Sequence, residues 1–185
     1  MSVFEITGKI CLVTGASRGI GAAVARGMGA NGAKVAVHYR SGRTEAELVA
    51  ADVEQSGGTA LLIQGDVAEP GAVERLVAET VSRFGRMDIL INNAGDQISR
   101  VNIADITDEL FDRHVAVNIR PTFAACRAAV RQFRKQGTGG NIINVSSIAA
   151  RTGGGGAKIG TQVTFALGAP LHPAYTGRFI LEGRA

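Results

Sequence analysis

The residues best suited to chemistry in this sequence form a glycine-rich segment, Thr14–Gly21, that reads T-G-A-S-R-G-I-G. The segment follows the apolar run 9–13, which predicts a buried strand, and precedes an Ala-rich helical pattern over 22–28. Such a loop presents free backbone N–H groups and the positive end of a helix dipole, and both attract phosphate. A plain connection between strand and helix is the alternative interpretation. Each glycine suits one role: Gly15 a tight turn, Gly19 a close approach to pyrophosphate, and Gly21 tight packing of the helix on the strand.

A second motif, N-N-A-G over 92–95, follows the strand-like run 87–91. The first motif has the spacing T-G-x-x-x-G-x-G, and together the two motifs resemble the signatures of the short-chain dehydrogenase/reductase family. The resemblance extends from about Thr7 to about Ser147 and is strongest to the beta-ketoacyl-carrier-protein reductases. It implies an oxidoreductase that uses a nicotinamide dinucleotide and acts on a carbonyl/alcohol pair.

Strand and helix patterns alternate along the chain, which predicts a parallel sheet covered by helices on both faces. Right-handed crossovers then predict a Rossmann-like, doubly wound α/β fold with strand order 3-2-1-4-5 and a cofactor cleft at the carboxyl ends of strands one and four. Pro121 interrupts the last helical pattern and predicts a kink or a boundary there. Strands are expected near 9–14, 34–39, 60–65, 88–92 and 141–146, and helices near 18–30, 44–56, 69–84 and 107–136.

The composition changes near Thr152, because 153–156 are four consecutive glycines. We therefore expect a nucleotide-binding domain over 1–151, truncated after strand five, and a divergent glycine-rich tail over 152–185. Within the tail, 161–167 alternates with period two, which favours a strand. The resemblance implies a further helix that carries the catalytic tyrosine of the family, and the tail shows no pattern for it.

The end of the second strand predicts which dinucleotide binds. An acid at this position binds the ribose hydroxyls and repels a 2′-phosphate, whereas a basic residue favours the phosphate. Here the strand is followed by R-S-G-R over 40–43, without an acid. Arg18 adds a second guanidinium, a group that suits phosphate. The sequence therefore predicts NADP(H) over NAD(H); the alternative is that Arg40 and Arg43 only solubilise a loop.

The family resemblance extends the predicted cofactor site over several loops. The pair Asp66–Val67 matches residues beside the adenine, and 93–95 match a turn that borders the adenosine ribose. Tyr39 is expected at the same corner. The complete predicted set is Gly15, Ser17, Arg18, Gly19, Ile20, Gly21, Tyr39, Arg40, Ser41, Asp66, Val67, Asn93, Ala94 and Gly95.

The resemblance also implies catalytic residues, since the family uses Asn, Ser, Tyr and Lys, the last two spaced Y-x-x-x-K. Asn118 matches the asparagine that supports a proton relay, and Ser147 matches the serine that orients the carbonyl. A helix-kink amide and a turn hydroxyl are their alternative roles. Neither tyrosine, Tyr39 or Tyr175, has a lysine four residues later, so Y-x-x-x-K is absent from this sequence.

Composition excludes several other classes. With 185 residues, of which 45% are hydrophobic, the chain can bury one substantial core. The net charge of +4 comes from scattered Arg and Lys, which predicts no nucleic-acid partner. Cys11 and Cys126 lack the spacing of a metal site, and no disulfide is expected. No run reaches the ~20 apolar residues of a membrane span, so we expect a cytoplasmic protein without a membrane partner.

Three interpretations of function remain open. The first is an NADP(H)-dependent short-chain oxidoreductase for a small-molecule carbonyl or alcohol, with catalysis impaired because Y-x-x-x-K is absent. The second is a dinucleotide-binding module without turnover, and the third is a truncated fragment that does not fold stably. The resemblance also implies a homo-oligomer, formed through the helix near 121–136.

Overall fold

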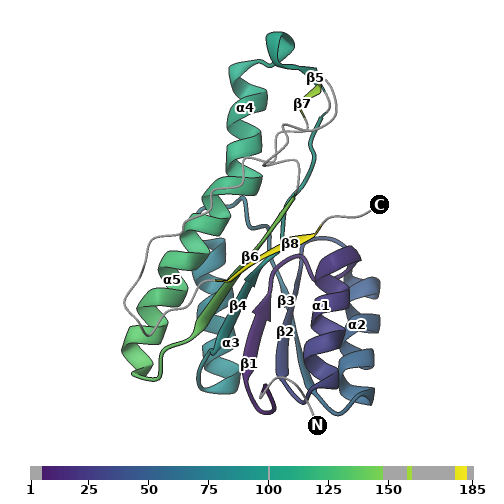
Figure 1. The fold of residues 1–185 in the computed structure, drawn as a ribbon, viewed down its shortest axis with the longest axis vertical. Coiled ribbons are helices and arrows are strands. Elements are labelled where there is room, and N and C mark those ends of the chain that lie inside the picture. Colours follow the sequence, from purple (N-terminus) through teal and green to yellow (C-terminus); the bar gives the residue numbers. More distant parts are fainter. Residues whose placement is uncertain (1–5, 100, 148–157, 160–177, 183–185) are drawn as a thin grey trace.

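A computed structural model describes residues 6–99, 101–147, 158–159 and 178–182 of the chain. Its centre is a parallel sheet in the order β3-β2-β1-β4-β6-β8 (Figure 1). The predicted strand order 3-2-1-4-5 is confirmed by the first five of these strands. The strands are β1 Ile10–Val13, β2 Lys34–Tyr39, β3 Thr59–Gln64, β4 Ile89–Asn92, β6 Asn141–Ser147 and β8 Arg178–Glu182.

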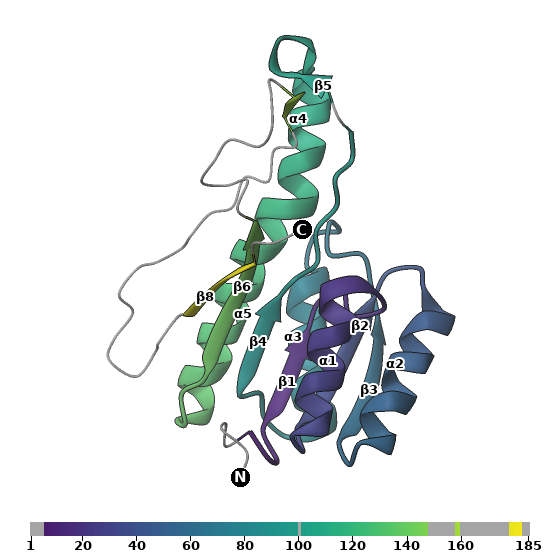
Figure 2. The ribbon, with the colours of Figure 1, turned by 45° about the vertical axis from the view of Figure 1, so that its right-hand side comes forward.

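Helices cover both faces of the sheet, α1 and α2 on one face and α3 and α5 on the other (Figure 1). Beyond the sheet, α4 extends the line of α5 and lies beside a short antiparallel pair, β5 and β7 (Figure 2). A single 3₁₀ turn, Ile103–Asp105, precedes α4. The remaining bounds are α1 Gly19–Ala30, α2 Arg43–Gln55, α3 Ala72–Phe84, α4 Asp108–His114, α5 Arg120–Gln136, β5 Val101–Asn102 and β7 Lys158–Ile159.

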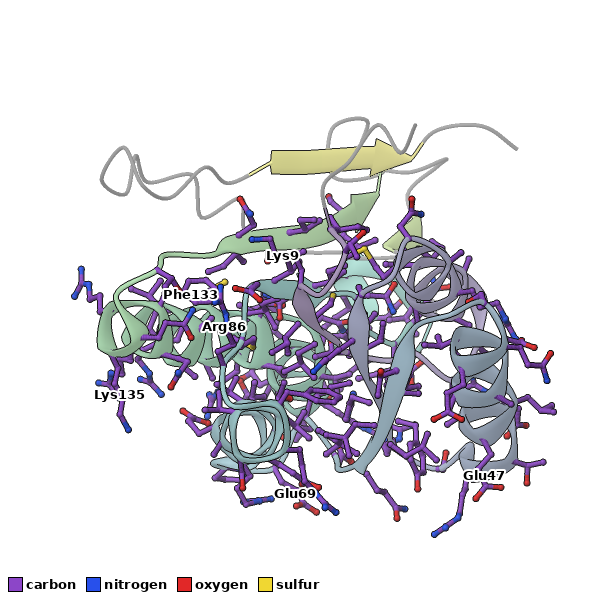
Figure 3. The ribbon with its side chains drawn as sticks, turned by 90° about the horizontal axis from the view of Figure 1, so that it is seen from below. Lys9, Glu47, Glu69, Arg86, Phe133 and Lys135 are labelled. Carbon is purple, nitrogen blue, oxygen red and sulfur yellow. The ribbon has the colours of Figure 1, made fainter. Side chains whose placement is uncertain are left out.

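Alternation along the strands divides the core into two layers. On β1, Cys11 and Val13 belong to the layer beneath α1 and α2, whereas Leu12 belongs to the layer beneath α3 and α5. Among the described residues, the largest fully buried side chain is that of Phe133, which points from α5 toward the sheet, while Lys135 points away from it (Figure 3). Because both faces of the sheet are covered, the central strand β1 is a continuous apolar run, I-C-L-V.

The helical pattern predicted over 107–136 is divided beside Pro121, as expected. One wider π-helical turn, Val115–Ile119, follows α4, and α5 begins at Arg120. Pro121 is therefore the second residue of α5, directly after the π-helical turn, a feature that often marks an irregularity within a helix.

The sheet extends one strand beyond the end predicted at strand five. β8 pairs in parallel with β6, with Ile143 opposite Arg178 and Ser147 opposite Glu182. The run F-I-L over 179–181 is typical of a strand, and without it the outer edge of β6 would be unpaired. The strand predicted over 161–167 lies outside the described residues.

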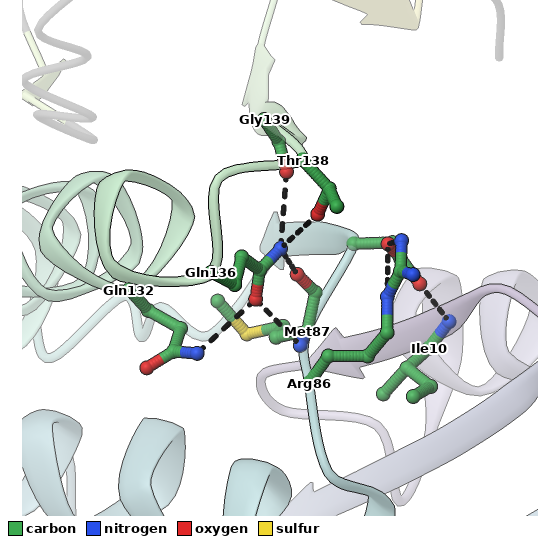
Figure 4. Close-up of polar contacts among 8 residues, drawn as sticks. Ile10, Arg86, Met87, Gln132, Gln136, Thr138 and Gly139 are labelled. Atoms are coloured by element: carbon green, nitrogen blue, oxygen red, sulfur yellow. Dashed lines mark hydrogen bonds and ion pairs between the residues drawn. The ribbon is translucent and has the colours of Figure 1, made fainter.

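A group of hydrogen bonds around Gln136 joins the end of α5 to the amino ends of β4 and β6 (Figure 4). The Gln136 side chain accepts from the N–H of Met87 at 3.3 Å and donates to the carbonyl oxygen of Met87 at 2.7 Å. Its amide nitrogen lies 3.1 Å from both Thr138 Oγ1 and the Gly139 carbonyl oxygen. One side chain thus fixes how α5 meets two neighbouring strands.

A buried carboxylate joins β1 to β4 at the same edge. Asp88 accepts from the N–H of Ile10 at 3.0 Å, and its other oxygen accepts from the Nε of Arg86 at 2.9 Å (Figure 4). The amino ends of β1, β4 and β6 are therefore held by side-chain hydrogen bonds.

We expect Gln136→Ala to lower the free energy of unfolding by about 1–3 kcal/mol, because it leaves the Met87 N–H and the facing carbonyl groups without their partner. Gln132→Ala is the matched control, since Gln132 donates one bond to Gln136 and should cost less than about 1 kcal/mol. Urea unfolding monitored by circular dichroism measures both. Equal losses in the two variants would contradict the role given to Gln136.

Candidate functional site

A cleft of about 280 Å³ lies at the carboxyl ends of the strands, where the loops after β1, β2, β3 and β4 meet. Most of the predicted cofactor residues line it: Gly15, Ser17, Arg18, Ile20, Arg40, Ser41, Asp66, Val67, Asn93, Ala94 and Gly95. Three others predicted from the sequence do not line it: Gly19, Gly21 and Tyr39. Four lining residues were missed: His38, Gly42, Asp96 and Val117.

The glycine-rich loop needs its glycines for reasons of space and conformation. Gly15 and Gly19 have positive φ angles of 64° and 58°, which side chains disfavour. A Cβ on Gly21 would lie 2.3 Å from the Gly15 carbonyl oxygen and 2.4 Å from Asn93 Nδ2. Gly15 thus has the conformation of a tight turn, and Gly21 packs closely against that turn and Asn93, where the sequence predicts packing of helix on strand. A Cβ on Gly19 would meet nothing within 4 Å among the described residues, so this glycine leaves open space where the loop enters α1.

The N-terminus of α1 is left free for an anion by its own side chains. Arg18 is the N-cap residue, its backbone is extended at φ −153°, and its side chain makes no capping hydrogen bond. The first turn of α1 contains no acidic residue. The positive end of the helix dipole therefore has no negative side chain in its first turn.

Two residues lock the glycine-rich loop to the loop after β4. Thr14 Oγ1 accepts from the N–H groups of Asn93 and Ala94, both at 3.0 Å. In return, Asn93 Nδ2 donates to the carbonyl oxygens of Thr14 and Gly15 at 2.9 and 3.0 Å. The N-N-A-G motif therefore has a structural role, because its second asparagine shapes the loop that the first motif forms.

His38 connects the same loop to the one after β3. Its Nδ1 accepts from the N–H of Gly15 at 3.0 Å, and its Nε2 lies 3.0 Å from the Gly65 carbonyl oxygen. This pairing assigns a neutral ring with the proton on Nε2, which donates to Gly65. Burial lowers the pKa of His38 below its ordinary value, against smaller raising effects of the Gly65 carbonyl and of Asp66.

Tyr39, which the sequence predicts at the cofactor corner, does not line the cleft. Only 3% of its surface is exposed, and it belongs to the core layer beneath α1 and α2. The reason is the two-residue period of β2, which places Val37 and Tyr39 on that face and turns His38 the other way. A histidine after the apolar run V-A-V over 35–37 was the available signal for His38.

The charges of the cleft come from two arginines and two acids. Asp66 Oδ1 accepts from the N–H of Ala68 at 2.9 Å, which fixes the turn after β3. Arg40 Nη2 lies 3.8 Å from Asp96 Oδ2. Among the residues that the structure describes, none forms an ion pair with Arg18. Arg18 is thus the cleft cation most readily available to a bound anion.

The predicted catalytic Asn118 lies in the π-helical turn and binds the loop after β4. Its Oδ1 accepts from the N–H of Asp96 at 2.9 Å, and its Nδ2 donates to the carbonyl oxygens of Asp96 and His114 at 3.0 and 3.1 Å. One of these bonds, to His114, lies within the helix itself, four residues back along the chain. The position also brings Asn118 beside the cofactor cleft, which its neighbour Val117 lines.

Ser147 is the last residue of β6, at the same carboxyl edge of the sheet as the cleft. Its side chain is not among those that the structure describes. Tyr175 lies outside the described residues altogether. The structure therefore positions the cofactor cleft and Asn118, and the catalytic role of Ser147 stays a prediction.

Other reactive groups contribute little to the site. Cys11 is buried in the core, and burial raises the pKa of its thiol, so it is no nucleophile. Within the described part of the chain, no three His, Cys, Asp or Glu residues gather as metal ligands. The described helices are also too short or too polar to cross a membrane.

The lowered pKa of His38 predicts a stability that falls in acid. Above about pH 6.5 both folded and unfolded chains hold a neutral ring. Below about pH 6.5 the histidine of the unfolded chain binds a proton, whereas His38 in the folded chain stays neutral because its pKa is lower. The free energy of unfolding therefore falls by up to about 1.4 kcal/mol per pH unit, until the pH drops below the folded pKa. His38→Asn keeps an acceptor for Gly15 and removes this titration. Urea unfolding from pH 7.5 to 5 should show a shallower pH slope in the variant; identical slopes would refute the assignment.

Comparison with known proteins places this architecture in a family. The family model described as short chain dehydrogenase matches residues 9–159. The versicolorin reductase of Emericella nidulans is 40% identical over 174 residues, covering 94% of this chain and 59% of that protein. The 3beta-hydroxysteroid dehydrogenase 1 of Eggerthella lenta is 37% identical over 144 residues, covering 78% of this chain and 55% of that protein. The chain thus spans less than two thirds of the length of these relatives.

Solved structures similar to this chain include members of the same family. A short-chain dehydrogenase from Burkholderia cenocepacia in complex with NADP is 39% identical, with a TM-score of 0.73 over 80% of this chain and 59% of that one. An NADH-dependent reductase, A1-R′, responsible for alginate metabolism is 33% identical, with a TM-score of 0.76 over 83% of this chain and 64% of that one. With both motifs locked together at the carboxyl edge of the sheet, this chain belongs to the short-chain dehydrogenase/reductase family.

Proposed function

We propose that this chain binds NADP(H), in preference to NAD(H), in the cleft at the carboxyl edge of the sheet. We further propose that it forms the cofactor-binding part of an oxidoreductase that interconverts a small-molecule carbonyl and an alcohol. The observation that carries this proposal is that two arginines, Arg18 and Arg40, line the cleft. In addition, no acidic residue follows β2 at the position where an acid would repel a 2′-phosphate.

The cleft suits a dinucleotide phosphate in three ways. The α1 N-terminus has no side-chain cap, Gly19 leaves open space beside it, and Arg18 has no ion-pair partner among the described residues. A guanidinium binds phosphate with two parallel hydrogen bonds, which strengthens the preference for a 2′-phosphate. Relatives of known structure include both an NADP complex and an NADH-dependent reductase, so they do not favour one cofactor over the other. The proposed preference for NADP(H) therefore rests on the residues of this chain.

The proposed chemistry is transfer of a hydride, which the nicotinamide supplies or accepts when it is bound. For this chemistry Ser147 orients the substrate carbonyl, and Asn118 holds the loop after β4 against the helical turn that borders the cleft. Protonation of the developing alkoxide needs an acid, for which the family pattern is Y-x-x-x-K. Because no Y-x-x-x-K occurs in this sequence, we propose that catalysis by the chain alone is impaired.

The helix near 121–136 is our proposed surface for association with a second copy. On α5, the Phe123 ring is 49% exposed and lies 5.3 Å from the guanidinium of Arg127. An exposed aromatic ring beside a cation is typical of interface residues.

Arg40→Ala should weaken NADPH binding by about 10- to 100-fold, because it removes charge-assisted hydrogen bonds to the 2′-phosphate. Binding of NADH should change less than about threefold, since NADH has no such phosphate. Isothermal titration calorimetry measures both affinities. Arg43→Ala is the matched control, because Arg43 is bound to Glu47 at 2.8 Å and does not line the cleft. Tighter binding of NADH than of NADPH by the unaltered chain, or unchanged NADPH affinity in Arg40→Ala, would overturn the preference.

Turnover should be weak, because a missing proton donor typically costs about 10²–10⁴-fold in rate. NADPH oxidation with a panel of ketones, followed by absorbance, should therefore barely exceed the rate without a ketone. A robust rate that Ser147→Ala abolishes would show instead that the chain has a complete active site.

A further inference from the structure

Arg40 and Asp96 face each other across the proposed cofactor cleft. Arg40 Nη2 lies 3.8 Å from Asp96 Oδ2, and the two side chains are 51% and 53% exposed. Both residues line the cleft that Gly15 and Arg18 also line. The pair is therefore open to solvent and to any ligand that enters.

The two residues come from strands that are not neighbours. Arg40 follows β2 and Asp96 lies in the loop after β4, while β1 runs between these strands. Adjacent strands lie about 4.8 Å apart, so the ends of β2 and β4 are separated by roughly 10 Å. The ion pair bridges this gap at the edge where the glycine-rich loop follows β1.

The backbones on both sides are held while the charged groups remain free to move. The backbone N–H and carbonyl of Asp96 are both bound by the Asn118 side chain, at 2.9 and 3.0 Å. The carbonyl oxygen of Arg40 accepts from Gln64 Nε2 at 3.1 Å. None of these three bonds involves the carboxylate of Asp96 or the guanidinium of Arg40. Arg40 can therefore exchange one anionic partner for another without movement of the strands.

We propose that Asp96 competes with the 2′-phosphate of the dinucleotide for Arg40 and so limits how strongly the site prefers a 2′-phosphorylated nucleotide. The proposal rests on the proposed function, in which Arg40 binds that phosphate. A phosphate carries more negative charge than a carboxylate and replaces it on the guanidinium. The free energy gained when Arg40 binds the phosphate is therefore reduced by the free energy of the Arg40–Asp96 ion pair that is lost.

The test compares two nucleotide fragments, 2′,5′-ADP and 5′-AMP, which share the adenosine and differ by the 2′-phosphate. Calorimetry at low salt with the full chain carrying Asp96→Asn should show 2′,5′-ADP bound about three- to fivefold more tightly, the scale of a half-exposed ion pair. Binding of 5′-AMP should change by less than about 1.5-fold, since it does not recruit Arg40. In the Arg40→Ala background, the gain from Asp96→Asn should disappear.

Asp52→Asn is the matched control, because it removes an acid that is also about half exposed and that pairs with Arg26 at 2.6 Å outside the cleft. It should leave both affinities unchanged. Thermal unfolding checks that the variants fold, and Asp96→Ala replaces Asp96→Asn if the amide perturbs the loop.

The outcomes separate the two proposals. An equal gain for both fragments, a gain that persists without Arg40, or no gain at all would overturn the competition. An unaltered chain that does not prefer 2′,5′-ADP over 5′-AMP would overturn the proposed NADP(H) preference instead. Coupling between Asp96 and Arg40 that appears for 2′,5′-ADP alone would establish the competition.

Discussion

The close contact between the loop after β1 and the loop after β4 is the constraint on which the rest of the site depends. A Cβ on Gly15 would lie 2.9 Å from the Cα of Ala94, so no larger residue fits without moving a backbone. The contact is closed by the reciprocal bonds of Thr14 and Asn93. The contact fixes two of the loops that line the cleft, the loop after β1 that enters α1 and the loop after β4.

Two further side chains extend the contact to distant elements. His38 binds the glycine-rich loop and the loop after β3, and Asn118 binds the loop after β4 to the turn between α4 and α5. In each case one side chain uses both of its polar ends, which leaves it a single favourable orientation. Four loops that are far apart in sequence thereby become one cleft. The charges on its walls then decide which anions it favours, since Arg18, Arg40, Asp66 and Asp96 all line it.

Much of the fold could be predicted from the sequence because the signals are local. The strand predicted over 34–39 is observed with the same bounds, and the break beside Pro121 is where the proline ring requires it. Tyr39, predicted at the cofactor corner, does not line the cleft, because the two-residue period of β2 turns its side chain into the core. β8 was missed because its pairing depends on the open edge of β6, which no local pattern reveals. Asp96 was missed because only the assembled sheet brings it opposite Arg40.

By itself, the sequence determined the order of the first five sheet strands and their helices, the glycine-rich loop, and the two motifs that identify the family. These follow from periodicity and from glycines at positions where the backbone tolerates no side chain. Only the tertiary structure decided that Asn93 shapes the loop of the first motif, that His38 rather than Tyr39 reaches the site, and that Arg40 has an acidic partner. The physical reason is that these contacts join the ends of separate strands, whose distances are set by sheet order and register and not by neighbours along the chain.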